Sequence, residues 1–155
     1  MGLVETTGIS TTVTGLIPNS EPNFAGFGVS QTSTIQQGTP SMTVVYSDST
    51  IDFFALNSFF YGCVLSTEES VEGLPASCTI TVTGFNTKGA VVAVQSFNFV
   101  ADAAQQQQQK AVLSSAFVGL QHADFKISST LGNATIVGLI DTVSYVVYST
   151  GALGN

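Results

Sequence analysis

The sequence predicts an all-β protein, a jelly-roll-like β-sandwich with about eight antiparallel strands in two sheets. Apolar residues recur mostly with a period of two, which is the period of a strand, rather than with the 3.6-residue period of a helix. Turn-forming Gly, Pro, Asn and Ser residues separate these segments at regular spacing. The chain has 155 residues with no visible internal repeat or linker, so we expect one domain over residues 1–155.

The clearest hairpin covers residues 79–100. In residues 79–85, Ile80 and Val82 alternate with threonines, as expected of a half-buried strand. Residues 86–89 follow as a turn in which Gly89 is suited to a positive φ, and residues 90–100 form the return strand.

Further strands are expected at residues 42–47, 51–62, 125–127, 134–140 and 142–148. The segment 51–62 is the longest apolar stretch, and its aromatic residues lie on both faces, where Phe53, Phe59 and Tyr61 alternate with Phe54 and Phe60. This pattern predicts a central strand that is covered on both sides, or one that is covered by a partner.

The segment 102–119 contains five consecutive glutamines, Gln105 to Gln109. We expect the glutamines to form a polar loop or a short helical turn, followed by a strand at about residues 112–118.

Cys63 and Cys78 lie at the end of one expected strand and at the start of the next. If the two strands are adjacent, their ends meet, and we expect a disulfide across the loop between them. Disulfides persist in oxidising compartments. Asn133 also begins an Asn-Ala-Thr glycosylation sequon. These features predict a secreted, extracellular glycoprotein.

The chain is acidic, because three Lys, no Arg and ten Asp or Glu residues give a net charge of −7. This charge repels phosphate backbones and anionic lipids. No apolar run reaches the roughly 18 residues of a membrane helix. We therefore expect no nucleic-acid or membrane partner, which leaves a glycan polymer, a cation or another protein.

Few residues point to enzyme chemistry. His122 is the only histidine and has Asp124 two positions further on, but no Gly-x-Ser-x-Gly motif marks a nucleophilic serine. A single histidine also argues against the usual zinc sites. We expect His122 to be a polar loop residue, and we expect a protein that is not an enzyme and requires no cofactor.

Two kinds of residue are candidates for binding. Asp52 and Asp141 each follow an apolar strand residue, and either could help to hold a structural calcium ion or could cap a turn. A tyrosine ring can stack on a sugar face while its hydroxyl forms hydrogen bonds, although core packing is the alternative role. The candidate ligand-binding residues are therefore Tyr46, Tyr61, Tyr145 and Tyr148.

The segments 51–61, 78–89 and 140–145 together resemble secreted fungal proteins of unassigned role and, more distantly, bacterial surface jelly rolls. The resemblance spans residues 50–148 and implies a jelly roll similar to galactose-binding-like domains and carbohydrate-binding modules. It also implies that Asp141 is the position at which such modules hold a structural calcium ion. The chain departs from typical sugar-binding modules because it has no Trp.

These observations predict a secreted, non-catalytic binding module for a neutral cell-wall or host glycan. The alternative is a self-associating structural or surface protein, which the low charge and the aromatic residues of segment 53–61 favour. An enzyme that uses acidic residues on a β-sandwich is a third class, with no local motif to support it.

Overall fold

The structure of the chain is a computed structural model, which describes residues 2–5, 15–20, 23–27, 39–65, 74–130 and 136–149. These residues form eleven strands and no helix. The strands are β1 (Gly2–Glu5), β2 (Gly15–Ile17), β3 (Asn23–Phe27), β4 (Ser41–Thr43), β5 (Phe53–Leu65), β6 (Cys78–Asn86), β7 (Val91–Phe99), β8 (Gln105–Gln107), β9 (Gln109–Val112), β10 (Leu120–Ser128) and β11 (Ile136–Tyr148). Within the described ranges, no helix is long and apolar enough to cross a membrane.

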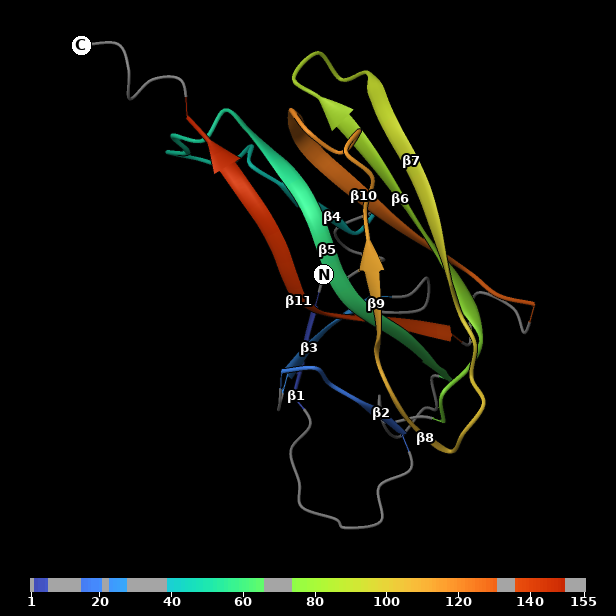
Figure 1. Ribbon diagram of the computed structural model, residues 1–155. Coiled ribbons are helices and arrows are strands. Elements are labelled where there is room, and N and C mark those ends of the chain that lie inside the picture. The colour runs from blue at the N-terminus through green and yellow to red at the C-terminus, as the bar shows by residue number, and fades with distance from the viewer. Residues whose placement is uncertain are drawn as a thin grey trace.

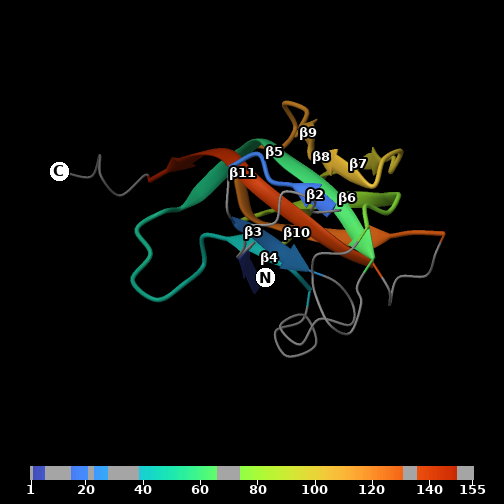
Figure 2. The same cartoon turned by 90° about the horizontal axis from the view of Figure 1, so that it is seen from below.

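The long strands form two layers. The first layer has the order β1-β3-β11-β5-β9, and the second has the order β4-β10-β6-β7. Among the described residues, one strand pairing links the layers, between Leu120 of β10 and Phe54 of β5. In Figure 2, β5 and β11 lie above β10 and β4, and in Figure 1, which is turned by 90°, the two layers lie one behind the other. The prediction of an all-β sandwich is confirmed, with more strands than the eight expected.

Aromatic side chains fill the space between the layers. The ring of Phe59 on β5 lies 5.6 Å from Phe97 on β7 and 5.6 Å from Phe125 on β10, edge to face in both cases. Such contacts add about 0.5–1.5 kcal/mol per pair beyond the burial of apolar area. The phenylalanines that are almost fully buried are Phe27, Phe54, Phe59, Phe99, Phe117 and Phe125.

The hairpin predicted for residues 79–100 is confirmed as β6 and β7. Gly89 has the expected positive φ of 76° and donates its N–H to Asn86 O over 2.9 Å. The neighbouring β10 is longer than the expected 125–127, because it pairs with β6 along nearly its whole length.

The strand β5 is central, as expected, but a bulge changes which aromatic residues face the core. Ser58 of β5 pairs with Ser144 of β11, and the next pair along the two strands is Leu56 with Tyr145. Asn57 is therefore an extra residue on β5, which is a β-bulge. The extra residue reverses the side-chain alternation. Phe54, rather than Phe53, therefore shares the buried face with Phe59 and Tyr61.

The two strands expected at 134–140 and 142–148 are one bent strand, β11. Its pairing with β5 shifts between Asp141 and Ser144, where Thr142 has a positive φ of 45°. That conformation is costly for a β-branched residue, so the surrounding contacts must hold it. Figure 1 shows β11 changing direction sharply along its course.

The glutamine segment does not form the predicted loop or helical turn. Gln105–Gln107 is the strand β8, which pairs in parallel with β2, and Gln109–Val112 is the strand β9, which pairs with the middle of β5. The strand expected at 112–118 is wrong, because β9 ends at Val112. Pairing with β2 and β5 supplies the backbone partners that a local sequence pattern does not reveal.

Candidate binding surface

Three of the four candidate tyrosines lie at the surface, and the fourth is in the core. Tyr46, Tyr145 and Tyr148 are 58%, 50% and 44% exposed. Tyr61 is only 4% exposed, and its ring packs against Phe59 and Phe99. A ring in that position cannot stack on a surface ligand, so the structure corrects the prediction for Tyr61 to a core role.

Tyr148 and Phe53 form a pair of stacked rings at the surface. The two residues are cross-strand partners on β11 and β5, and their ring centroids lie 5.0 Å apart with an interplanar angle of 20°. Among the described residues, the only strand that pairs with the other side of β11 is β3, and it does so only at residues 138–140. One face of the Tyr148 ring is therefore covered by Phe53, and the opposite face lies toward an unpaired strand edge. We call Phe53 and Tyr148 the ring platform.

Tyr145 lies on the other face of the same strand. Its partner on β5 is Leu56, which is buried in the core, so Tyr145 lies at the core-facing margin of the sandwich. Residues 143–148 of β11, which we call the open edge, thus carry half-exposed apolar side chains on both faces. The side chains of Tyr145, Val146, Val147 and Tyr148 are each between 43% and 50% exposed.

A buried carboxylate holds the bend that precedes the open edge. Asp141 is 8% exposed, and one of its oxygens accepts a hydrogen bond from the N–H of Ser20 over 2.5 Å. The other oxygen accepts the Ser20 hydroxyl and the N–H of Thr142, the latter over 2.6 Å. Hydrogen bonds to a carboxylate are stronger than neutral ones, so Asp141 can stabilise the positive φ of Thr142.

Two amide side chains extend this buried cluster. The Nδ2 of Asn19 donates to Thr142 Oγ1 over 3.0 Å, and the N–H of Asn19 donates to Gln108 Oε1 over 3.1 Å. The Nε2 of Gln108 donates in turn to Leu139 O over 3.1 Å. The turn after β2 and the glutamine segment are thereby tied to both sides of the bend in β11.

The geometry at Asp141 favours the capping role over the calcium role. The donors around its carboxylate present hydrogen atoms, whereas a calcium site presents oxygen atoms from several groups. Asp52 lies just before β5, and Asp141 pairs with Phe60, so the two acids are separated by about 25 Å of strand and cannot share one ion. Among the described residues, no three His, Cys, Asp or Glu side chains lie together as metal ligands would.

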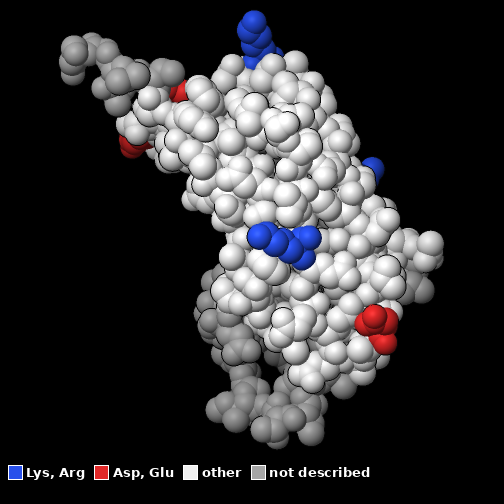
Figure 3. Space-filling model, in the orientation of Figure 1, with Lys and Arg blue, Asp and Glu red and all other residues white. Residues whose placement is uncertain are grey.

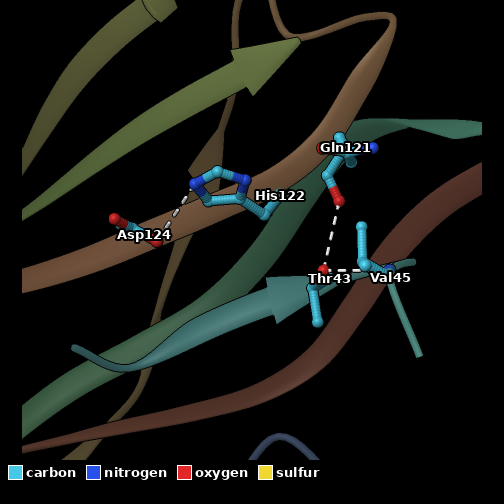
Figure 4. A network of polar contacts seen from close by, with 5 residues as sticks. All are labelled: Thr43, Val45, Gln121, His122 and Asp124. Atoms are coloured by element: carbon cyan, nitrogen blue, oxygen red, sulfur yellow. Dashed lines mark hydrogen bonds and ion pairs between the residues drawn. The ribbon is translucent and has the colours of Figure 1, made fainter. Parts of the chain in front are cut away.

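His122 lies on a strand rather than in the expected loop. Its ring stacks on Phe85 of β6 with centroids 4.3 Å apart, and its Nε2 lies 3.9 Å from Asp124 Oδ1. Burial raises the pKa of Asp124, and the charge of His122 partly opposes that shift. Figure 4 shows His122 and Asp124 on the same side of β10, while the nearby hydroxyl of Thr43 is directed to Gln121 O. The hydroxyl of Thr43 is therefore not positioned as a nucleophile by His122.

The predicted disulfide is present in the structure. Cys63 on β5 and Cys78 at the start of β6 form a disulfide with a Cα–Cα distance of 6.2 Å. The loop that they close is also held by Ala76, whose N–H donates to Cys63 O over 2.9 Å. The predicted glycosylation site, Asn133, lies outside the described residues.

Charged side chains are sparse on the surface. Figure 3 shows isolated lysine and acidic side chains on a face that is otherwise uncharged. The open edge itself contains only Val, Ser and Tyr. A ligand at the ring platform would meet rings, hydroxyls and backbone groups rather than a charged cluster.

Sequence reasoning missed three features of these surfaces. It did not single out Phe53 as the partner of Tyr148, because the bulge at Asn57 is not visible in the pattern. It did not separate Gln108 from its neighbours, because all five residues are identical in type. The stacking of His122 on Phe85 was also missed, although the alternation in 122–127 was the signal that could have placed His122 on a strand.

No protein-family model and no curated protein matches this sequence.

Proposed function

We propose that this protein is a secreted, non-catalytic binding module for a neutral glycan polymer, with the ring platform as its main contact. The observation that carries the proposal is the stacking of Tyr148 on Phe53 at an unpaired strand edge. A ring that is supported on one face and accessible on the other suits the apolar face of a sugar ring. The Tyr148 hydroxyl can at the same time exchange hydrogen bonds with sugar hydroxyls.

The uncharged surroundings favour a neutral ligand over a charged one. No residue of the open edge carries a charge, and the whole chain has a net charge of −7. Sugar hydroxyls need donors and acceptors rather than opposite charges. Binding of this kind should change little with salt, unlike recognition by exposed ion pairs.

The strand order supports a jelly-roll topology for this module. Apart from β1, which extends one layer beside β3, eight strands make two four-stranded sheets, β3-β11-β5-β9 and β4-β10-β6-β7, and the chain passes repeatedly from one sheet to the other. Jelly rolls with two such sheets include lectin domains, although a fold does not by itself define a function. The disulfide between Cys63 and Cys78 supports secretion, because such bonds persist in oxidising compartments.

The test is a panel of insoluble β-glucan, chitin, cellulose and mannan, incubated with the protein at low and high salt, with and without a chelator. The proposal expects retention by at least one polysaccharide, with little dependence on salt. Because Asp141 is surrounded by protein donors, retention should also survive chelation. Retention by none of the four would reject the glycan proposal.

A second candidate function is self-association as a structural or surface protein. The specific observation that favours it is the run of four half-exposed apolar residues on the open edge. Exposed apolar patches on an unpaired strand are typical of sites of strand pairing between chains. Light scattering against protein concentration tests this function, and a particle size that stays monomeric at all concentrations would reject it.

A further inference from the structure

The outer surface of the second layer carries polar side chains from three neighbouring strands. His122, Asp124 and Lys126 alternate with the buried residues of β10, so their side chains point away from the core. Ser41 of β4 and Thr83 of β6 are the direct partners of Asp124 on its two sides. Neighbouring strands lie about 4.8 Å apart, so these three side chains form a row across the sheet. We call Ser41, Thr83, His122 and Asp124 the polar cluster.

The polar cluster differs from the other polar groups on the same surface. Further along β6, the hydroxyls of Thr81 and Ser96 share a hydrogen bond over 2.8 Å, and Thr79 donates to Asn98 Oδ1 over 2.8 Å. Among the described residues, no side chain of the polar cluster forms a hydrogen bond with the protein. The contact of 3.9 Å between its imidazole and its carboxylate is too long to be one. The cluster therefore keeps its donors and acceptors for groups outside the described chain.

Asp124 is an unusual residue for its position. Asp is disfavoured in strands, and β10 lies between β4 and β6 rather than at an edge of the sheet. The side chain is only 30% exposed, and burial raises the pKa of its carboxyl group because the charged form is poorly solvated. No hydrogen bond within the described residues offsets this cost. A residue that departs from local preference without a compensating contact is expected at a functional site.

We propose that the polar cluster binds a sugar residue through two adjacent hydroxyl groups, with Asp124 as the main acceptor. An ionised carboxylate has two oxygens that only accept, so it can take a hydrogen bond from each of two hydroxyls. Ser41 and Thr83 can each donate or accept, and a neutral imidazole does both through its two nitrogens. This set matches sugar hydroxyls, which also donate and accept. Hydrogen bonds to a carboxylate are stronger than neutral ones, and more so where water is partly excluded.

The imidazole of His122 is held between two neighbours. The ring of Phe85 stacks on it with centroids 4.3 Å apart and an interplanar angle of 11°. Thr43 is the partner of His122 on the other side, and its hydroxyl is already used, because it accepts the N–H of Val45 and donates to Gln121 O. Figure 4 shows this arrangement, with the carboxylate beside the imidazole. Phe85 thus positions the imidazole, and its half-exposed ring offers an apolar contact to the C–H groups of a sugar.

Other ligands fit the polar cluster less well. Only His122 and Asp124 are of the types that usually bind metal ions, and no group of three such residues occurs in the described ranges. A bound amine would use the carboxylate but leave the hydroxyls idle, and it would meet the ammonium group of Lys126, the next outward residue on β10.

The polar cluster is separate from the ring platform. Tyr148 and Phe53 lie on the outer surface of the first layer, whereas the polar cluster lies on the outer surface of the second. The inference therefore adds a second site to the proposed function and does not require the first to be correct. Two sites on opposite surfaces would let one copy of the protein contact two glycan chains at once.

The first experiment is a titration followed by proton NMR. His122 is the only histidine, so its imidazole C–H signals can be identified in the full chain without further assignment. At fixed pH, the methyl glycosides of mannose, galactose and glucose are added in turn. We expect a saturable shift of these signals with at least one glycoside. The absence of a saturable shift with all three, or an equal shift with methylammonium chloride, would overturn the inference.

The second experiment repeats the titration with variants. Asp124→Asn should weaken binding by about tenfold or more, whereas Asp102→Asn removes the same charge from an exposed position and should bind like the wild type. Tyr148→Ala should leave the response of His122 unchanged, so the two proposed sites fail separately. Equal affinities of Asp124→Asn and Asp102→Asn would contradict the role of Asp124.

Thermal denaturation separates a binding role of Asp124 from a structural one. Because burial disfavours its charged form and no described residue donates to it, Asp124→Asn should melt at the same temperature as the wild type or higher. A clear fall in the melting temperature would show that Asp124 holds the fold together, and this result would overturn the inference.

Discussion

The phenol of Tyr61 on β5 donates a hydrogen bond to the carbonyl of Asn98 on β7, over 2.8 Å, and so joins the two layers of the sandwich. The ring of Tyr61 packs against Phe97 and Phe99, which also lie on β7. A residue that the sequence analysis assigned to a ligand therefore has a structural role. Its hydroxyl supplies a polar contact beside a core of aromatic and aliphatic side chains.

The substitution Tyr61→Phe removes this hydroxyl and keeps the ring. We expect the free energy of unfolding to fall by about 1 kcal/mol at neutral pH, the usual net value of one hydrogen bond. The comparison is Tyr145→Phe, whose hydroxyl is half-exposed and should matter by less than about 0.5 kcal/mol. Urea denaturation measures both, and equal losses would contradict the role of Tyr61.

The ionisation of Tyr61 should make the free energy of unfolding depend on pH. Burial raises the pKa of Tyr61 above its usual value of about 10.0, because the charged form is poorly solvated. The folded state thus favours the neutral phenol, and this contribution to stability is present below pH 10 and is lost as the pH rises through the folded pKa. Unfolding free energies measured from pH 8 to 11 should fall more steeply for the wild type than for Tyr61→Phe. Parallel curves would show that Tyr61 ionises as it does in the unfolded chain.

Gln108, the buried member of its run, is predicted to contribute to stability through its side-chain amide. Its amide pairs with Leu139 O and with the N–H of Asn19, whereas Gln107 is exposed. In Gln108→Ala both partners lose their bond. Asn19 is exposed and its N–H can bond to water, whereas the bond to Leu139 O is buried, and a buried unsatisfied group costs about 1–3 kcal/mol. Gln107→Ala is the matched control and should change the free energy of unfolding by no more than about 0.5 kcal/mol. If the two substitutions have similar effects in thermal denaturation, the hydrogen bonds of Gln108 at the bend of β11 do not stabilise the fold as proposed.

Gly138 is predicted to be required by the ring of Phe27. A Cβ added at Gly138 would lie 2.7 Å from Cζ of Phe27, which is itself almost fully buried. Overpacking of this kind costs about 1–3 kcal/mol. We expect Gly138→Ala to lower the melting temperature, and we expect Phe27→Leu to recover part of the loss in the double variant. Purely additive losses would show that the two residues do not compete for the same space.

The disulfide should appear directly in the mass of the native protein. Non-reducing mass spectrometry is expected to give a mass that is lower than that of the reduced chain by two hydrogen atoms. Replacing both Cys63 and Cys78 with Ala should lower the free energy of unfolding by about 3 kcal/mol, the chain-entropy value for a loop of this length. Two alkylatable thiols in the native protein would refute the bond.

Local patterns in the sequence were sufficient for the elements whose partners are adjacent in the chain. The hairpin of β6 and β7 was predicted because alternating threonines and the turn at Gly89 act over a few residues. The disulfide was predicted from the places of Cys63 and Cys78 at the ends of successive segments, but β5 and β6 lie in different layers rather than side by side as the prediction supposed.

Features that depend on distant partners were not predictable in this way. Gln108 is distinguished from its neighbours only by contacts with residues 31 and 89 positions away. The bulge at Asn57 lies where β5 pairs with β11, a strand more than 70 positions further along the chain, and it reverses the alternation that would have assigned Tyr61 and Phe53 to one face. The capping role of Asp141 depends on Ser20, which lies 121 positions away.

The most direct test of the proposed function compares two tyrosines on opposite faces of one strand. Tyr148→Ala and Tyr145→Ala remove rings of similar exposure, but only the first disrupts the stack on Phe53. Retention on β-glucan, chitin, cellulose and mannan is measured for both variants and for the wild type, with circular dichroism as a check on folding. We predict that the wild type is retained by at least one polymer and that Tyr148→Ala weakens retention by about tenfold, while Tyr145→Ala stays close to the wild type. No retention of the wild type, or equal retention of the two variants, would contradict the ring platform as a glycan site.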